Sequence, residues 1–246
     1  MTDIAPDSMG LGRLPEFDEE SRKFNIRAIL EIPYARSYTW GCEPVYNQGR
    51  EGACVGFAWV HEANAKPSVQ PVGDSTARAL YRAAQKIDEW PGEDYEGTSV
   101  LAGAKMAKTY GWLGEYRWAF NVPDALSAIS RKGPAVIGVN WYDGLYYPTD
   151  GELRIYGDIV GGHAILVRGV RLVFQPGTTT EQKQSSRWFS YLDQKASKVL
   201  LHNSWGPTWG GTAKGPGTAY LSVEDYARLM SEQGECCIPV VRTSGR

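Results

Sequence analysis

The chain has 246 residues, of which 42% are hydrophobic and 22% charged, with a formal net charge of -2. These values are typical of one globular domain or two small lobes that share a core, and they exclude a largely disordered chain. The 26 Lys and Arg are scattered among 28 Asp and Glu without a basic run, so we expect no nucleic-acid partner. The longest apolar stretches, residues 135–139 and 164–167, are far shorter than the roughly 20 residues of a membrane span, so no membrane partner is expected either.

The beginning of the chain and its cysteines indicate the cellular compartment. Residues 1–7 are polar and acidic, unlike a secretory signal, which predicts a cytoplasmic protein. Cys42, Cys54, Cys236 and Cys237 are too few for a disulfide framework in a chain of this length. A bridge from Cys42 to Cys236 or Cys237 remains open. No Cys-x-x-Cys pair indicates zinc, and we expect no metal or organic cofactor.

In chain order, we expect an extended N-terminal arm at the surface, then a helical lobe, then a sheet-rich lobe. The three parts span residues 1–40, 41–120 and 121–246. Apolar periodicity bounded by capping residues, Pro and Gly predicts the helices. They cover residues 54–65, 75–90, 99–110, 123–132 and 223–233, with Ser99 or Thr98 capping the third and Ser222 the last.

Runs rich in β-branched and aromatic residues predict the strands of the C-terminal lobe. They cover residues 135–142, 163–174, 198–205, 217–223 and 237–242. Residues 175–197 are polar and rich in turn formers, and we expect a long excursion between two adjacent strands. A cleft between the helical and the sheet-rich lobe is the natural place for a functional site.

Cys54 is the residue that points to chemistry. It follows small residues and begins a predicted helix, where free backbone N–H groups and the helix dipole stabilise a thiolate. Gln48 lies six residues earlier on a glycine-flanked turn, so its side-chain amide could donate to an oxyanion beside the sulfur. Gly49 and Gly52 let the backbone fold back closely enough for this.

A thiol nucleophile needs a base, and the sequence contains three histidines. His61 follows Cys54 by seven residues, about 10 Å along a helix, which is too far for a hydrogen bond. We interpret His61 and His202 as structural. His163 begins a strand after two glycines and is the best candidate base, and Asn203 could hold its ring through the amide oxygen.

These segments together resemble the papain family of cysteine peptidases. The glutamine and cysteine motif at residues 48–54, the pair His163-Ala164 and the segment Asn-Ser-Trp-Gly at residues 203–206 occur in the family's order of Gln, Cys, His and Asn. Three of the five positions of the signature C-G-[SA]-C-[WY] agree at residues 51–55. The resemblance covers about residues 41 to 242 and is dense at three short motifs.

The resemblance implies an α+β fold with two lobes, one helical and one a barrel-like sheet, and an active site in the cleft between them. It implies Cys54 as nucleophile, His163 as proton shuttle, Asn203 as the orienting residue and Gln48 as oxyanion donor. The function would be that of a cysteine-type endopeptidase, which hydrolyses peptide bonds in a peptide or protein substrate through a thioester acyl-enzyme, with no cofactor.

The resemblance further implies a set of substrate-binding residues and an apolar side chain in the second pocket before the cleaved bond. Those residues are Gly97 and Thr98 in a turn that pairs with substrate backbone, Gly162 beside the base, and Trp205 over the His163–Asn203 pair. No long segment precedes Cys54, so we expect no pro-domain, and at most the first 40 residues would cover the cleft.

Two other functions remain open. One is a different acyl-transfer enzyme on the same fold, such as a cell-wall peptide hydrolase or a transglutaminase-like protein. The other is a non-enzymatic structural relative, for example within a virus particle. Glu51 stands where many secreted relatives have a disulfide-forming cysteine, so the chain resembles compact prokaryotic or bacteriophage members, and virion association would follow from a bacteriophage origin.

Overall fold

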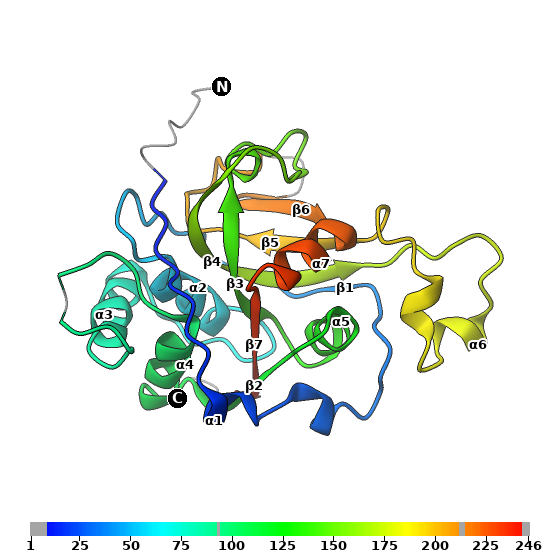
Figure 1. The fold of residues 1–246 in the computed structure, drawn as a ribbon, viewed down its shortest axis with the longest axis horizontal. Coiled ribbons are helices and arrows are strands. Elements are labelled where there is room, and N and C mark those ends of the chain that lie inside the picture. The colour runs from blue at the N-terminus through cyan, green and yellow to red at the C-terminus, as the bar shows by residue number, and fades with distance from the viewer. Residues whose placement is uncertain (1–8, 93, 212–214, 243–246) are drawn as a thin grey trace.

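The structure is a computed structural model, and it describes residues 9–92, 94–211 and 215–242. One antiparallel sheet runs through the molecule with helices on both sides (Figure 1), which confirms the α+β class. α2, α3 and α4 lie on one side of β3 and β4, and α5 and α7 lie on the other. None of the described helices is both long and apolar enough to cross a membrane.

The helices, in chain order, are α1 (Glu19–Arg22), α2 (Cys54–Ala63), α3 (Asp74–Ala84), α4 (Val100–Thr109), α5 (Val122–Arg131), α6 (Thr180–Lys183) and α7 (Val223–Ser231). Short 3-10 turns cover Ile26–Ile29, Asp143–Leu145 and Trp188–Tyr191. The strands are β1 (Tyr38–Thr39), β2 (Leu113–Trp118), β3 (Ala135–Tyr142), β4 (Ile159–Arg171), β5 (Lys198–His202), β6 (Thr218–Ser222) and β7 (Glu235–Arg242).

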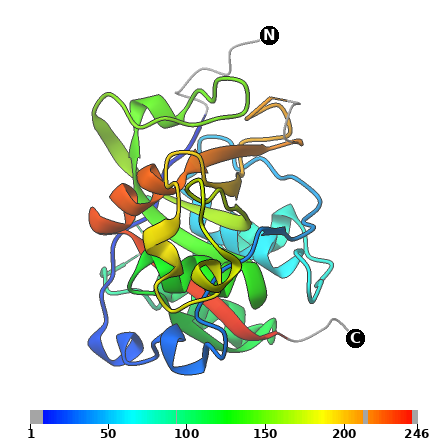
Figure 2. The same cartoon turned by 90° about the vertical axis from the view of Figure 1, so that its right-hand side faces the viewer.

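The sheet order is β2-β7-β3-β4-β5-β6, and β1 pairs with the far end of β4. β3 and β4 form the central pair, in the register Val136 with Leu166, Gly138 with Ala164 and Val139 with His163. β4 and β5 are neighbours, as expected, and the excursion between them projects from one end of the molecule (Figures 1 and 2).

β3 and β4 are a wall shared by two hydrophobic cores. Because successive side chains of a strand point to opposite faces, each strand contributes to both. Val136 and Ala164 pack into the core of α2, α3 and α4. Ile137 and Val139 pack into the other core, with α5, α7 and the aromatic rings of the sheet. The helix that begins at the candidate nucleophile is therefore packed directly against the strand that carries the candidate base.

Side-chain caps set several helix ends where the sequence predicted them. The hydroxyl of Ser99 accepts from Ala102 N at the start of α4, and the hydroxyl of Ser222 accepts from Asp225 N at the start of α7. α3 is shorter than predicted and ends at Ala84. The following residues turn instead, and the Gln85 side chain donates to the Tyr95 carbonyl, an alternative to continued helix.

Two parts of the fold differ from the sequence-based expectation. β2 was not predicted, because polar and apolar residues alternate only over residues 115–118, and the register shifts against β7 place Leu113 out of phase with this short run. The N-terminal arm was expected at the surface. Instead, Met9 and Arg13 are almost fully buried, and Figure 1 shows this part of the chain running between the helices and β3.

Candidate active site

The turn that leads to Cys54, at residues 47–54, and the segment at residues 203–206 are joined through their backbones. Asn47 and Trp205 form an antiparallel bridge, and Gln48 N donates to the Ser204 carbonyl at 2.8 Å. α2 then begins at Cys54, whose side chain is fully buried. The structure thus brings together two motifs that lie about 150 residues apart in sequence, because an antiparallel bridge fixes their register.

The sulfur of Cys54 lies against β4. The backbone N–H of Ala164 donates to Cys54 Sγ at 3.3 Å. β4 begins at Ile159, so His163 lies within the strand, whereas the two preceding glycines predicted that it begins the strand. Ala164 directly follows His163, so the candidate nucleophile contacts the backbone next to the candidate base. The Val55 N–H also points to the sulfur, as expected at a helix start.

Asn203 fixes the tautomer of His163. Asn203 Oδ1 accepts from the backbone N–H of Ser204 at 2.8 Å, so this atom is the acceptor of the amide. The same oxygen lies 2.8 Å from His163 Nε2, which must therefore carry a proton and donate. In a neutral ring Nδ1 is then the basic nitrogen. This atom is buried and has no hydrogen-bond partner among the described residues.

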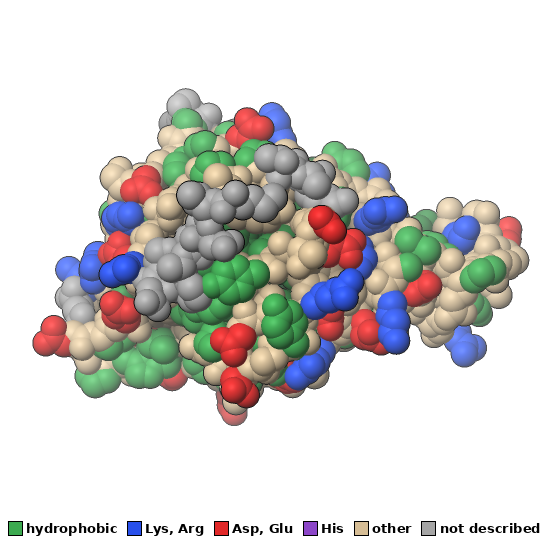
Figure 3. Space-filling model, turned by 90° about the horizontal axis from the view of Figure 1, so that it is seen from above, with side chains coloured by type: hydrophobic (Ala, Val, Ile, Leu, Met, Phe, Trp, Pro, Cys, Tyr) green, Lys and Arg blue, Asp and Glu red, His purple; other side chains and the backbone are tan. Residues whose placement is uncertain are grey.

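Two indole rings enclose the His163 ring. Trp205 stacks on it with ring centroids 4.6 Å apart and an angle of 25° between the planes. Trp141 meets it edge-on, also at 4.6 Å. All three histidines are buried. Accordingly, no histidine is visible on the face of the molecule seen in Figure 3, where acidic and basic side chains are intermixed. The rings therefore keep water from the His163–Asn203 hydrogen bond.

The Gln48 side chain is held with its amide nitrogen toward the cleft. Ser204 Oγ donates to Gln48 Oε1 at 2.6 Å, which fixes the orientation of the amide. Gln48 Nε2 donates to the Glu51 carbonyl at 2.8 Å and to the Gly10 carbonyl at 3.1 Å. The nitrogen expected to stabilise an oxyanion therefore already donates to a peptide carbonyl in the cleft.

The Gly10 carbonyl belongs to residues 9–14, which we call the cleft segment. Thr98 pairs with this segment on both sides of Arg13, since its N–H donates to the Gly12 carbonyl and its carbonyl accepts from Leu14 N. Opposite Thr98, the Gly162 carbonyl accepts from the N–H groups of Gly12 and Arg13, both at 3.0 Å. The Gly12 N–H also points to the Cys54 sulfur. The segment thus lies between Thr98 and Gly162 and passes the Cys54 sulfur.

Glycines make this close approach of backbones possible. A Cβ on Gly162 would lie 2.1 Å from the Arg13 carbonyl, and one on Gly97 would lie 2.4 Å from the Gly12 carbonyl. A Cβ on Gly12 would lie 2.1 Å from the carbonyl of Gly52. Gly97 also has a φ of 104°, in the region that favours glycine. The candidate substrate-binding residues Gly97, Thr98 and Gly162 therefore all contact the cleft segment.

Burial favours the neutral forms of both Cys54 and His163. Desolvation raises the pKa of the Cys54 thiol to about 11, although three backbone N–H groups lower it in part. Desolvation lowers the pKa of His163 to about 4, against a smaller opposite effect of the Asn203 hydrogen bond. The sequence predicted a thiolate at the helix start. The covered site differs because loss of water outweighs the helix dipole.

The remaining cysteines and histidines lie outside this site. All four cysteines are free thiols, so Cys42 forms no bridge to Cys236 or Cys237. His61 and His202 are buried together with ring centroids 4.5 Å apart. Within the described part of the chain, no group of three or more His, Cys, Asp or Glu is placed to hold a metal ion.

Three residues of the site were not identified from the sequence as parts of the site: Ser204, Arg13 and Glu235. Ser204 adjoins Asn203, but its pairing with Gln48 follows only from the backbone register between the two segments. The pair Gly10 and Gly12 was the available signal for a segment that runs close to another backbone. Glu235 lies two residues before the predicted strand at residues 237–242, whereas β7 begins at Glu235 itself.

Solved structures with a similar fold are cysteine proteases. Xylellain, a cysteine protease from Xylella fastidiosa, matches with a TM-score of 0.61 and 15% identity over 98% of both chains. The chain has the papain-like fold. Digestive procathepsin L 3 from Tenebrio molitor matches at 0.57 and 13%, over 95% of this chain and 76% of that one. The recombinant stem bromelain precursor matches at 0.52 and 15%, over 98% and 79%.

At these identities the likeness establishes the fold alone. Neither a model of a known protein family nor a curated protein matches the sequence. The papain-like fold confirms the architecture that the motifs at Cys54, His163 and Asn203 implied. The fold by itself assigns no chemical role to these residues.

The close contact at Gly12 gives a test of the cleft segment as a cover. Gly12→Val adds a side chain that cannot fit against the Gly52 carbonyl. Overpacking of this kind costs about 1–3 kcal/mol. The equilibrium between the seated and the displaced cleft segment therefore shifts roughly 5- to 150-fold toward the displaced form. We expect Cys54 to react faster with iodoacetamide by a factor in this range, measured by peptide mass mapping.

Gly41→Val is the matched control, since a Cβ there meets Lys66 at an ordinary distance of 3.7 Å. Cys42, Cys236 and Cys237 should stay slow to react in both variants if the fold is intact. An unchanged rate at Cys54 in Gly12→Val would contradict the covering role of the segment.

Proposed function

We propose that the chain is a cysteine-type endopeptidase that hydrolyses peptide bonds through a thioester acyl-enzyme. One observation supports this more than any other. Gln48 Nε2 donates to the carbonyl of a peptide segment that passes the Cys54 sulfur, beside the part of β4 where Asn203 holds His163. A nucleophile, a base with an orienting amide and an oxyanion donor are thus grouped around a bound peptide backbone.

The first half-reaction transfers the acyl group to sulfur. His163 Nδ1 takes the proton of the Cys54 thiol while the sulfur attacks the scissile carbonyl carbon. Gln48 Nε2 and the Cys54 backbone N–H stabilise the negative charge that develops on the carbonyl oxygen. The carbon–nitrogen bond then breaks, the leaving amine takes the proton from His163, and a thioester remains on Cys54.

The second half-reaction hydrolyses the thioester and regenerates the free enzyme. A water molecule attacks the thioester carbon and gives one proton to His163, and the same two donors stabilise the oxyanion. The carbon–sulfur bond breaks, the acid product leaves, and the sulfur regains its proton from His163. Asn203 keeps Nε2 protonated in both steps, so that Nδ1 remains the nitrogen that faces the chemistry.

The reaction requires that the cleft segment leave first. Its departure admits water to Cys54 and His163, which removes the desolvation that now holds the thiol pKa high and the imidazole pKa low. Both groups then move toward the ion pair that a thiol nucleophile uses.

The nucleophile is tested by Cys54→Ala. Because no other side chain replaces the attacking sulfur, we expect cleavage of a fluorogenic peptide to fall by about 10³-fold or more. The melting temperature should change little, since a small buried side chain replaces another. Cys42→Ala is the matched control, a second buried thiol outside the site, and should retain activity. Residual activity above roughly a tenth of wild type in Cys54→Ala would contradict the mechanism.

The oxyanion donor is tested by Gln48→Ala. Loss of one such donor lowers kcat by about 10²- to 10³-fold with little change in KM, because the interaction forms in the transition state. Steady-state kinetics on the same peptide measure the effect. The exposed Gln184 in the excursion provides the control Gln184→Ala, which should match wild type. A Gln48→Ala variant with wild-type kcat would remove Gln48 from the mechanism.

A further inference from the structure

The Arg13 side chain fills a pocket beside the candidate nucleophile. Arg13 is the residue of the cleft segment that follows Gly12, whose N–H points to the sulfur of Cys54. Its own N–H donates to the Gly162 carbonyl, next to the candidate base. The Arg13 side chain is 1% exposed, so it lies inside the protein rather than across the surface of the cleft.

A single row of residues across three strands forms one wall of this pocket. Ala164 on β4 pairs with Gly138 on β3, and Gly138 pairs with Glu235 on β7. Paired residues of neighbouring strands point to the same face, and the strands lie about 4.8 Å apart. The row therefore begins at Ala164, whose N–H contacts the Cys54 sulfur, and ends at the Glu235 carboxylate, about two strand spacings away.

The missing side chain of Gly138 leaves the space that Arg13 occupies. A Cβ on Gly138 would lie 2.8 Å from Arg13 Nε, 2.8 Å from Val100 Cγ2 and 3.0 Å from Glu235 Oε2. These three neighbours delimit the pocket, with Val100 at the start of α4 as its apolar side. The alkyl part of a long side chain can thus pass over Gly138 and reach the acid.

The end of the pocket is built for a guanidinium group. Arg13 Nε and Nη2 both donate to Glu235 Oε2, at 2.9 and 2.6 Å, and Nη2 also donates to the Gln233 carbonyl at 2.6 Å. Such a planar fork of donors is specific to arginine among the side chains. Glu235 Oε1 is buried and has no hydrogen-bond partner within the described part of the chain, so the carboxylate can accept a further hydrogen bond.

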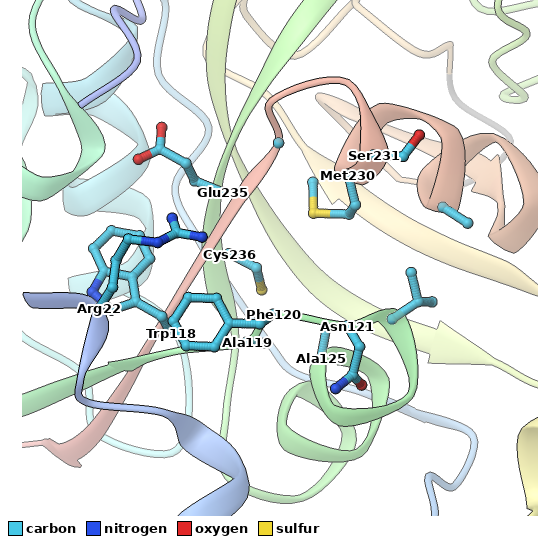
Figure 4. A pocket seen from close by; sticks show the side chains of 13 residues that line it. Arg22, Trp118, Ala119, Phe120, Asn121, Ala125, Met230, Ser231, Glu235 and Cys236 are labelled. Atoms are coloured by element: carbon cyan, nitrogen blue, oxygen red, sulfur yellow. The ribbon is translucent and has the colours of Figure 1, made fainter. Parts of the chain in front are cut away.

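The Glu235 side chain is buried, with 1% of it exposed. A hollow of about 260 Å³ borders the residue between the end of β2, α5 and α7, and Figure 4 shows the Glu235 carboxyl directed away from Met230 and Ser231 on α7. Burial raises the pKa of Glu235 to about 7, and Arg13 acts in the opposite direction. A buried carboxylate that loses its cation is costly, so the pocket favours an occupant that brings a positive charge.

We propose that the Arg13 pocket is the specificity pocket of the cleft, that it takes an arginine side chain of the substrate, and that Glu235 is its specificity-determining residue. The proposal rests on the peptidase function proposed above and names the substrate class of the same site. Arg13 occupies the pocket while the cleft segment is in place. The apolar side chain that the family resemblance implied is therefore replaced by a basic one.

The substrate preference is measured with paired peptides that contain arginine or citrulline. Citrulline has the shape of arginine without the charge, and the pair is placed in turn at each of the four positions before the scissile bond. The Arg13→Ala variant, whose pocket is open, is assayed beside wild type. A hydrogen bond to a charged group contributes about 1.5–3 kcal/mol, so at one position kcat/KM should favour arginine by roughly 10- to 100-fold.

Glu235→Gln should abolish this preference while citrulline peptides are still cleaved, because it keeps the volume of the side chain and removes its charge. Glu224→Gln, an exposed acid on α7, is the matched control and should retain the preference. Equal cleavage of both peptides at all four positions would overturn the pocket assignment and leave the peptidase function standing.

A binding measurement decides the pocket assignment without catalysis. Ethylguanidinium, a small guanidinium compound, should raise the melting temperature of Arg13→Ala in a saturable manner. It should not do so in wild type, where Arg13 fills the pocket, nor in the double variant Arg13→Ala/Glu235→Gln. Stabilisation of Arg13→Ala with no peptide cleaved by any variant would support the pocket and reject the peptidase. The absence of stabilisation in a folded Arg13→Ala would overturn the pocket.

Discussion

The contact between the start of α2 and Ala164 within β4 is the interaction on which the arrangement of the candidate site depends. The Ala164 N–H donates to the Cys54 sulfur, and this hydrogen bond connects a helix of one core to a strand shared by both. It fixes the nucleophile beside His163, whose ring is held by Asn203 and enclosed by indoles. The papain-like arrangement of two cores on either side of β3 and β4 is what makes this one contact possible.

Desolvation sets the state of the site. With the cleft segment in place the thiol and the imidazole are both neutral, because a low dielectric disfavours an ion pair that lacks enough polar partners. The same segment contributes the cation that neutralises Glu235. The cleft segment thus lies beside the Cys54 sulfur and also supplies the charge that balances Glu235.

Sequence reasoning reached the fold class and the helix caps Ser99 and Ser222. It named Cys54, His163 and Asn203 because each belongs to a short motif with its own chemistry, and their roles stay predictions. It did not find β2, in which polar and apolar residues alternate only over residues 115–118. Nor did it place Arg13 in a pocket with Glu235, since these residues are 222 positions apart and meet through the register of β3 and β7. Local signals predict elements and motifs, whereas the charge state of a site depends on what covers it.

NMR titration of the histidine rings shows directly whether the buried site holds a neutral thiol and a neutral imidazole. With three histidines, each assigned from its glutamine variant, the ring signals are few enough to follow one by one. We expect that the His163 signal of the folded chain does not titrate between pH 5.5 and 8, in keeping with a pKa of about 4. A His163 ring that is protonated at neutral pH in the folded chain would show that burial does not keep the pair neutral.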